Sequence, residues 1–226
     1  FKFTGACLGH RKGGVAMAAI GACAGFGAIC GSSLATAATM GKVALPELRR
    51  LGYSGALSTG TLAAGGTLGI LIPPSVILII YSILTEQNIA KMFLAAFIPG
   101  ILAALGYIFA IGLYVRFVKG SGPTKERVGW KERLSLFKNI WQIILIFLVM
   151  IGGIYLGWFT PTEGGAIGAG GAGLIAISNK NFKFGDLVDV IESTAITSAM
   201  IFLVLLGAEF FNSFIALTQL PNQLGE

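Results

Sequence analysis

Gly31, Ser32, Ser33 and Thr36 form a polar group inside an otherwise apolar stretch of this chain. Serine and threonine supply hydroxyl oxygens, and glycine permits backbone angles that release carbonyl oxygens from helical hydrogen bonding. Neutral oxygens of these two kinds are suitable ligands for a hard cation such as Na⁺. The group is therefore a candidate cation site.

A second polar group follows further along the chain. Its members are glycines and a threonine, namely Gly65, Gly66, Thr67 and Gly69. Pro73, Pro74 and Ser75 come directly after it, and both glycine and proline weaken a helix. Residues 54–84 are therefore predicted to be a transmembrane helix broken near its middle, with free carbonyl oxygens at residues 65–69. The helix N-termini at such a break favour anionic groups.

The first group lies within a segment of unusual length. Residues 13–46 contain one charge, Lys42, between a basic pair at residues 11–12 and another at residues 49–50. One crossing needs about 20 apolar residues and two need about 40, so the segment fits neither. Basic flanks favour the cytoplasmic side. We expect a re-entrant hairpin that enters from the cytoplasm and turns at residues 31–33.

A purely structural interpretation of both groups stays open. Serine and threonine hydroxyls can bond to carbonyls one helical turn back, and glycines can serve as packing contacts between helices. A hairpin next to a broken helix favours the site, because the small residues between positions 13 and 41 would allow the two loops to approach closely.

Composition places the chain in a membrane. It is 55% hydrophobic and 12% charged, with a mean hydropathy of +0.82. The net charge is +6, and the basic residues lie in a few clusters. This clustering is typical of the loops of a membrane protein and argues against a nucleic-acid-binding surface. His10 and the three cysteines, Cys7, Cys23 and Cys30, lack metal-ligand spacing.

The predicted architecture is all-α and polytopic. Residues 1–12 are expected to be a loop at the end of a preceding scaffold segment, and residues 92–118 a crossing. Residues 119–138 form a basic cytoplasmic connector, with a surface helix near residues 130–137. Further crossings are predicted at 139–158, 164–178 and 187–217, and residues 218–226 form an external segment.

Some patterns resemble other sites. Residues 168–173 fit the dinucleotide pattern G-x-G-x-x-G, but the pattern needs a preceding strand, and an apolar segment favours helix packing instead. Residues 36–43 lack the spacing of a phosphate loop, so the chain encodes no ATPase. Glu163, Glu192 and Glu209 are expected to have interfacial or packing roles. No catalytic constellation lies within the membrane segments, so we expect no enzyme. A channel or pore-lining subunit remains the alternative to a transporter, since re-entrant loops also build selectivity filters.

The combination of GSSLATAATMG, GTLGILIPPS and GWFTPTEGGAIGA resembles the large membrane subunit of TRAP (tripartite ATP-independent periplasmic) transporters. The resemblance implies an elevator-type inverted-repeat fold and a Na⁺-coupled importer of small organic acids, such as C4-dicarboxylates or sialic acid. It also implies a bacterial inner-membrane location, with a small membrane subunit and a periplasmic solute-binding protein as partners. Na⁺ would be the coupling ion, and no other cofactor is implied.

In that family, the first hairpin and the adjacent helix break form one Na⁺ site. The resemblance carries this role onto the hydroxyls and glycines of the two groups described above. It also implies that this chain is a fragment, which lacks the N-terminal scaffold helices and the second hairpin with its own ion site.

Overall fold

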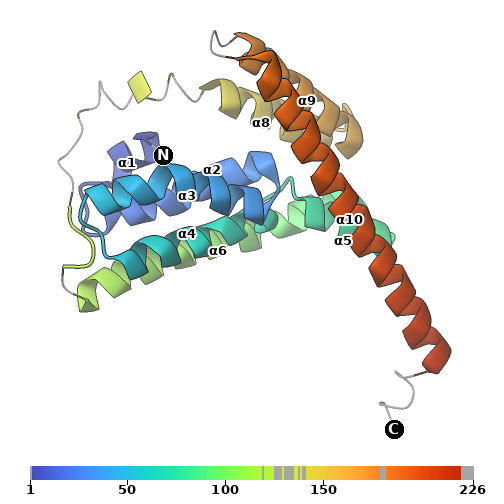
Figure 1. The fold of residues 1–226 in the computed structure, drawn as a ribbon, viewed down its shortest axis with the longest axis horizontal. Helices are drawn as coiled ribbons and strands as arrows, with labels where there is room; N and C mark the ends of the chain where they lie inside the picture. Colours follow the sequence, from blue (N-terminus) through green and yellow to red (C-terminus); the bar gives the residue numbers. More distant parts are fainter. Residues whose placement is uncertain are drawn as a thin grey trace. The chain divides into compact units, whose positions relative to one another are not determined.

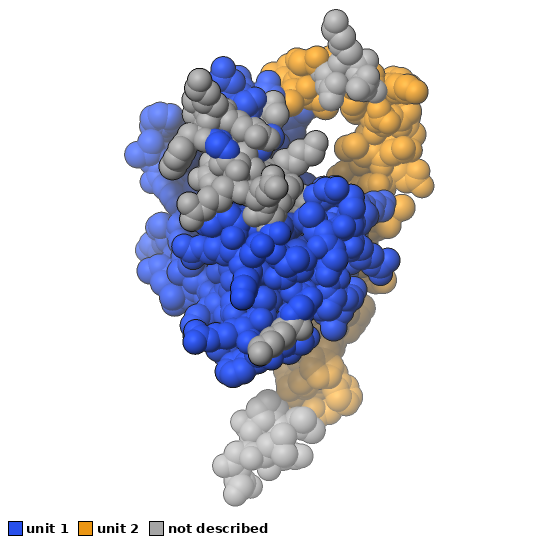
Figure 2. All heavy atoms as spheres, turned by 90° about the vertical axis from the view of Figure 1, so that its left-hand side faces the viewer, with its two compact units in different colours: residues 1–172 blue, residues 173–226 orange. Residues whose placement is uncertain are grey.

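The computed structural model describes residues 2–118, 120–124, 129, 135, 136, 138, 141–178 and 182–219. Every regular element in these ranges is an α-helix. The chain divides into two compact units, residues 1–172 and residues 173–226 (Figure 2).

The hairpin consists of α2 (Gly14–Cys30) and α3 (Ser33–Arg50). Gly31 between them has a φ of 64°, a left-handed conformation that favours glycine. The Ser32 side chain then caps α3 by accepting a hydrogen bond of 3.3 Å from the Ala35 backbone N–H. The turn therefore falls where the sequence predicted it.

The next helix is broken at the predicted prolines, and it stays helical through the glycines before them. α4 (Gly55–Leu71) and α5 (Val76–Leu84) are bent by 43° at a break over residues 72–75. Pro73 and Pro74 lack the backbone donors that a continuing helix needs. At residues 65–68 the predicted release of carbonyls is wrong, because these residues are helical within α4 and Leu68 O accepts from the Ile72 N–H; Gly69 O differs, because Pro73, four residues on, has no N–H to donate. The glycines of this stretch are packing positions: a Cβ added at Gly65 would lie 2.7 Å from Cys23 Sγ.

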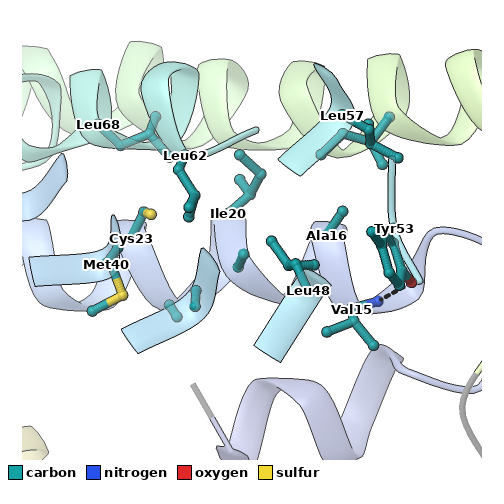
Figure 3. Packing of buried hydrophobic residues seen from close by; sticks show 14 of the residues in the cluster. Val15, Ala16, Ile20, Cys23, Met40, Leu48, Tyr53, Leu57, Leu62 and Leu68 are labelled. Carbon is teal, nitrogen blue, oxygen red and sulfur yellow. Dashed lines mark hydrogen bonds between the residues drawn. The ribbon is translucent and has the colours of Figure 1, made fainter. Parts of the chain in front are cut away.

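The core of the first unit lies where the hairpin meets α4 and α6 (Ile89–Phe117). α2 and α3 pack along α4, and α6 packs against α4 and α2 (Figure 1). Ile20, Cys23, Leu48 and Leu68 are fully buried in this cluster (Figure 3). Because the hairpin helices run along α4, the turn of the hairpin reaches the break at the end of α4.

The basic segments around the hairpin gather at its base. The Gly13 N–H donates to Gly122 O at 3.1 Å, and the Ser54 N–H donates to Ser121 O at 3.1 Å. These bonds join the two ends of the hairpin to the segment after α6. The exposed basic residues of this end are Arg11, Lys12, Arg49, Arg50 and Arg116. Their common position agrees with the expectation that all three segments face one side of the membrane.

The expectation of a loop at residues 1–12 is wrong for most of this range, because a helix, α1 (Lys2–Leu8), forms there. This short helix packs against α2, which gives its residues an apolar surface to cover. Ala6, for example, is 6% exposed. Hydrophobic contact with the hairpin thus stabilises helical structure where charge and position alone suggested a loop end.

The later helices are α8 (Trp141–Tyr155), α9 (Pro161–Ser178) and α10 (Phe184–Thr218). Of the described helices, α6 and α10 are each long and apolar enough to cross a membrane, and the bent pair α4 and α5 passes the same test together. α8 is apolar but shorter. The crossings at 139–158 and 164–178 stay predictions. The surface helix expected near 130–137 and most of the external segment at 218–226 fall largely outside the described residues.

Gly168 and Gly171, in the stretch that carries the dinucleotide-like pattern, belong to α9 and pack against α8, whereas a Cβ added at Gly170 or Gly173 would meet no atom within 4 Å. An added Cβ would lie 2.9 Å from Met150 Sδ at Gly168, and 3.2 Å from Ile146 Cγ1 at Gly171. No strand precedes this helix among the described residues, as the dinucleotide motif would require. The helix-packing interpretation therefore describes the contacts of Gly168 and Gly171 and does not account for Gly170 and Gly173.

Candidate ion and substrate site

The tip of the hairpin lies directly against the helix break. The Val76 N–H at the start of α5 donates to Gly31 O at 3.3 Å. A Cβ added at Gly31 would lie 2.9 Å from Pro74 O, so only glycine fits here without displacement. Two loops from separate parts of the sequence are thus joined by one hydrogen bond and one close backbone contact.

Two oxygens of the tip face the backbone of α4. Thr36 is fully buried, and its hydroxyl donates to Ser32 O at 2.7 Å. A Cβ added at Gly69 would lie 2.6 Å from Thr36 Oγ1 and 2.7 Å from Ser32 O. These distances bring a hydroxyl oxygen and a carbonyl oxygen together beside the last turn of α4.

The close approach of the helices depends on small residues. A Cβ added at Gly27 would lie 2.6 Å from Gly69 Cα, and one added at Gly66 would lie 2.7 Å from Ala37 Cβ. Gly27 is a site-supporting residue that the sequence did not single out. Its only signal was the general abundance of small residues in the hairpin.

Four helix ends converge at this point. The C-termini of α2 and α4 bring carbonyl oxygens, and the N-termini of α3 and α5 bring N–H groups. Ser75, 1% exposed, caps α5 by accepting from the Leu78 N–H at 3.4 Å, as Ser32 caps α3. The carbonyl ends favour a cation and the N–H ends favour an anion, so the arrangement can hold both.

The structure brings most, but not all, of the predicted residues to this place. Gly31, Ser32, Ser33 and Thr36 lie at the tip, and Gly66 and Gly69 lie against it. Gly65 packs instead on Cys23. Thr67 faces α6, where its hydroxyl lies 3.0 Å from Tyr107 Oη and donates to Ala64 O at 2.7 Å. For Gly65 and Thr67 the packing interpretation describes the observed contacts.

The chemistry of the donor set is neutral. Among the described residues, no group of three or more His, Cys, Asp or Glu side chains could hold a metal ion. Ser32 O and Thr36 Oγ1 are uncharged hard oxygens, the kind of ligand that suits Na⁺. The residues of the tip therefore fit the ion that the sequence led us to expect.

Glu163 forms hydrogen bonds within its own turn at the start of α9. Thr160 donates to the Glu163 carboxylate from its backbone N–H at 2.7 Å and from its hydroxyl at 2.9 Å, and the Glu163 N–H donates back to Thr160 Oγ1 at 3.3 Å. This capping box begins α9 and gives Glu163 a structural role. Glu192 and Glu209 occupy exposed positions on α10.

The family model described as "Tripartite ATP-independent periplasmic transporter, DctM component" matches residues 1–226. The chain belongs to this family. It is 35% identical over 224 residues to the C4-dicarboxylate TRAP transporter large permease protein of Pseudomonas aeruginosa, covering 98% of this chain and 52% of the relative. It is 33% identical over 233 residues to the sialic acid TRAP transporter permease of Haemophilus influenzae, covering 100% of this chain and 36% of the relative.

The chain spans about half the length of the large permeases that it matches. One of these is the C4-dicarboxylate TRAP transporter large permease protein of Vibrio cholerae. The chain is 38% identical to it over 193 residues, covering 85% of this chain and 41% of the relative. As a member of the TRAP large-permease family with helices of membrane-spanning length, it is a multi-pass protein of the bacterial inner membrane. Its relatives are transporter permeases and not enzymes.

Proposed function

We propose that this chain is the part of a TRAP large permease that holds one Na⁺ site and contributes to the binding of a small carboxylate. The observation that carries the proposal is the contact between the hairpin tip and the helix break, where neutral oxygens and helix N-termini meet. Membership of the family supports the transporter class over the channel alternative.

The geometry suggests an order of events. Na⁺ binds first, between Ser32 O, Thr36 Oγ1 and the end of α4, and fixes the tip against the break. The N–H groups at the starts of α3 and α5 then receive the carboxylate, because the bound cation and the helix dipoles both favour negative charge there. The block that contains the hairpin moves relative to the scaffold and alternates the access of the site.

The substrate class rests on the relatives. Their names specify C4-dicarboxylates, sialic acid and ectoine, which carry a carboxylate, and isethionate, which carries a sulfonate. We therefore propose a small organic acid, delivered by a periplasmic solute-binding protein to a complex that also contains the small membrane subunit.

Uptake by the full-length complex in proteoliposomes tests the proposal. Thr36→Val removes the tip hydroxyl that the proposal places on Na⁺, and we expect the half-saturating Na⁺ concentration to rise about tenfold, equivalent to about 1.4 kcal/mol of lost interaction. Thr59→Val is the matched control, because the Thr59 hydroxyl is exposed and bonds only within its own helix, to Gly55 O and Ala56 O. The control should keep the wild-type Na⁺ dependence.

Two results would count against the proposal. An unchanged Na⁺ dependence in Thr36→Val would remove the Thr36 hydroxyl from the ion site. A substrate flux that rises linearly and does not saturate would instead favour a channel, since a channel needs no occupied site for each transported molecule.

A further inference from the structure

Tyr53, between α3 and α4, lies at the centre of a hydrogen-bonded cluster at the hairpin base. Its hydroxyl accepts from the Val15 N–H at 3.1 Å and donates to Pro123 O at 2.8 Å. Figure 3 shows the first of these bonds beside the buried core. One side chain thus links the start of the hairpin, its end, and the segment that follows α6.

The backbone around Tyr53 repeats the same three-way connection. Gly13 bonds to Gly122 and Ser54 bonds to Ser121, in each case N–H to O at 3.1 Å. A Cβ added at Gly122 would lie 3.0 Å from Gly13 Cα, so the two backbone segments are in close contact. Residues far apart in the sequence are therefore held together by direct backbone contact.

The cluster is largely closed to solvent. Tyr53 is 5% exposed and Ser121 is 3% exposed. Burial raises the pKa of the Tyr53 phenol, although hydrogen bonds from the Val15 and Ala16 backbone oppose this shift. The phenol therefore keeps its proton at neutral pH and stays able to donate to Pro123 O. Buried hydrogen bonds are costly to break, because their partners would be left without water.

We propose that Tyr53 is a positioning residue, which fixes the start of the basic connector to the hairpin base so that residues 120–124 travel with the hairpin as one body. The inference rests on the proposed function, since it assumes that the hairpin block moves during transport. It adds a boundary of the moving body, which the ion site alone does not define.

Reversible cross-linking tests the proposal in the full-length complex, in an otherwise cysteine-free subunit. Gly55→Cys and Thr124→Cys place exposed thiols next to the bonded pairs, and an added Cβ at Gly55 meets no atom within 4 Å. A short bifunctional thiol reagent should join them, and uptake should stay within twofold of the reduced sample. Single-cysteine variants treated with the same reagent are the control.

Tyr53→Phe supplies a second readout. Without the hydroxyl, uptake should fall several-fold, and the cross-link should restore it by joining the same segments covalently. If cross-linking abolishes uptake and reduction restores it, or if the thiols do not react with each other, the proposal is wrong. A complex that shows no Na⁺-dependent uptake before any reagent is added would instead contradict the proposed function. In that case, formation of the cross-link would still test whether these two segments are in close contact.

Discussion

Gly27 and Gly69 approach each other backbone to backbone, and this contact sets the distance between the hairpin and α4. The Ser32 carbonyl and Thr36 hydroxyl lie beside the same Gly69. A side chain at Gly27 would push α2 away from α4 and would separate the two halves of the proposed site. A residue without any polar side-chain atom would therefore set the geometry of the proposed site.

Gly27→Ala should weaken Na⁺ binding and destabilise the subunit by about 1–3 kcal/mol, the usual cost of overpacking. The half-saturating Na⁺ concentration of uptake measures the first effect, and thermal unfolding in detergent measures the second. Gly25→Ala is the matched control in the same helix, because a Cβ there meets no atom within 4 Å. Equal Na⁺ affinities in the two variants would mean that the Gly27 contact has no part in the site.

Thr67 shows the limit of prediction at the residue scale. Its hydroxyl has the same chemistry as that of Thr36, and it lies between glycines that do contact the tip. Only the helical rotation of α4 decides that it faces Tyr107 and not the hairpin. Because residues 65–69 were predicted to be a loop, the direction of the Thr67 side chain could not be predicted from a helical rotation.

At the scale of elements, proline was a reliable signal and glycine was not. Proline removes a backbone donor wherever it stands, so the break at residues 72–75 could be predicted. Glycine in a membrane helix also serves close packing, and Gly65, Gly66 and Gly69 remain helical because their neighbours fill the space of the missing side chains. The hairpin turn could be predicted because its length and charged flanks restrict the topology.

The start of α9 gives a pH prediction. Hydrogen bonds from the Thr160 backbone and hydroxyl lower the pKa of the Glu163 carboxyl, which lies in the turn before the predicted crossing. The stabilisation by the ionised form is therefore fully present above the ordinary carboxyl pKa of about 4.3 and is lost as the pH falls through the lowered value. We expect no change between pH 7 and about pH 5, and loosening of this turn in stronger acid.

The fluorescence of Trp158, which is 73% exposed and close to this turn, can follow the change in a full-length variant with its other tryptophans replaced. Glu163→Ala should remove the acid-dependent step, because the carboxylate that titrates is gone. Glu163→Gln should remove the step as well but keep the cap at neutral pH. An acid transition that is the same in wild type and in Glu163→Ala would contradict this role.

At the scale of the whole molecule, the contacts within residues 1–172 place one complete tip and one complete break together. The family match extends over the entire chain, while the chain spans about half the length of its relatives. Transport, partners and substrate are therefore properties of the full subunit in its complex, and the proposed contribution of this part is one Na⁺ site. That contribution can be measured as binding, independently of transport.

The most direct measurement is Na⁺-specific thermal stabilisation of the purified full-length subunit. A ligand that binds only the folded state stabilises it, by about 1.4 kcal/mol at roughly ten times its Kd. The melting temperature should rise in NaCl relative to equal KCl for the wild type and for Thr36→Ser, which keeps the hydroxyl. Thr36→Val, which removes only that oxygen, should lose most of the rise. A Thr36→Val variant with the full Na⁺-specific rise would contradict a Na⁺ site between the tip and α4.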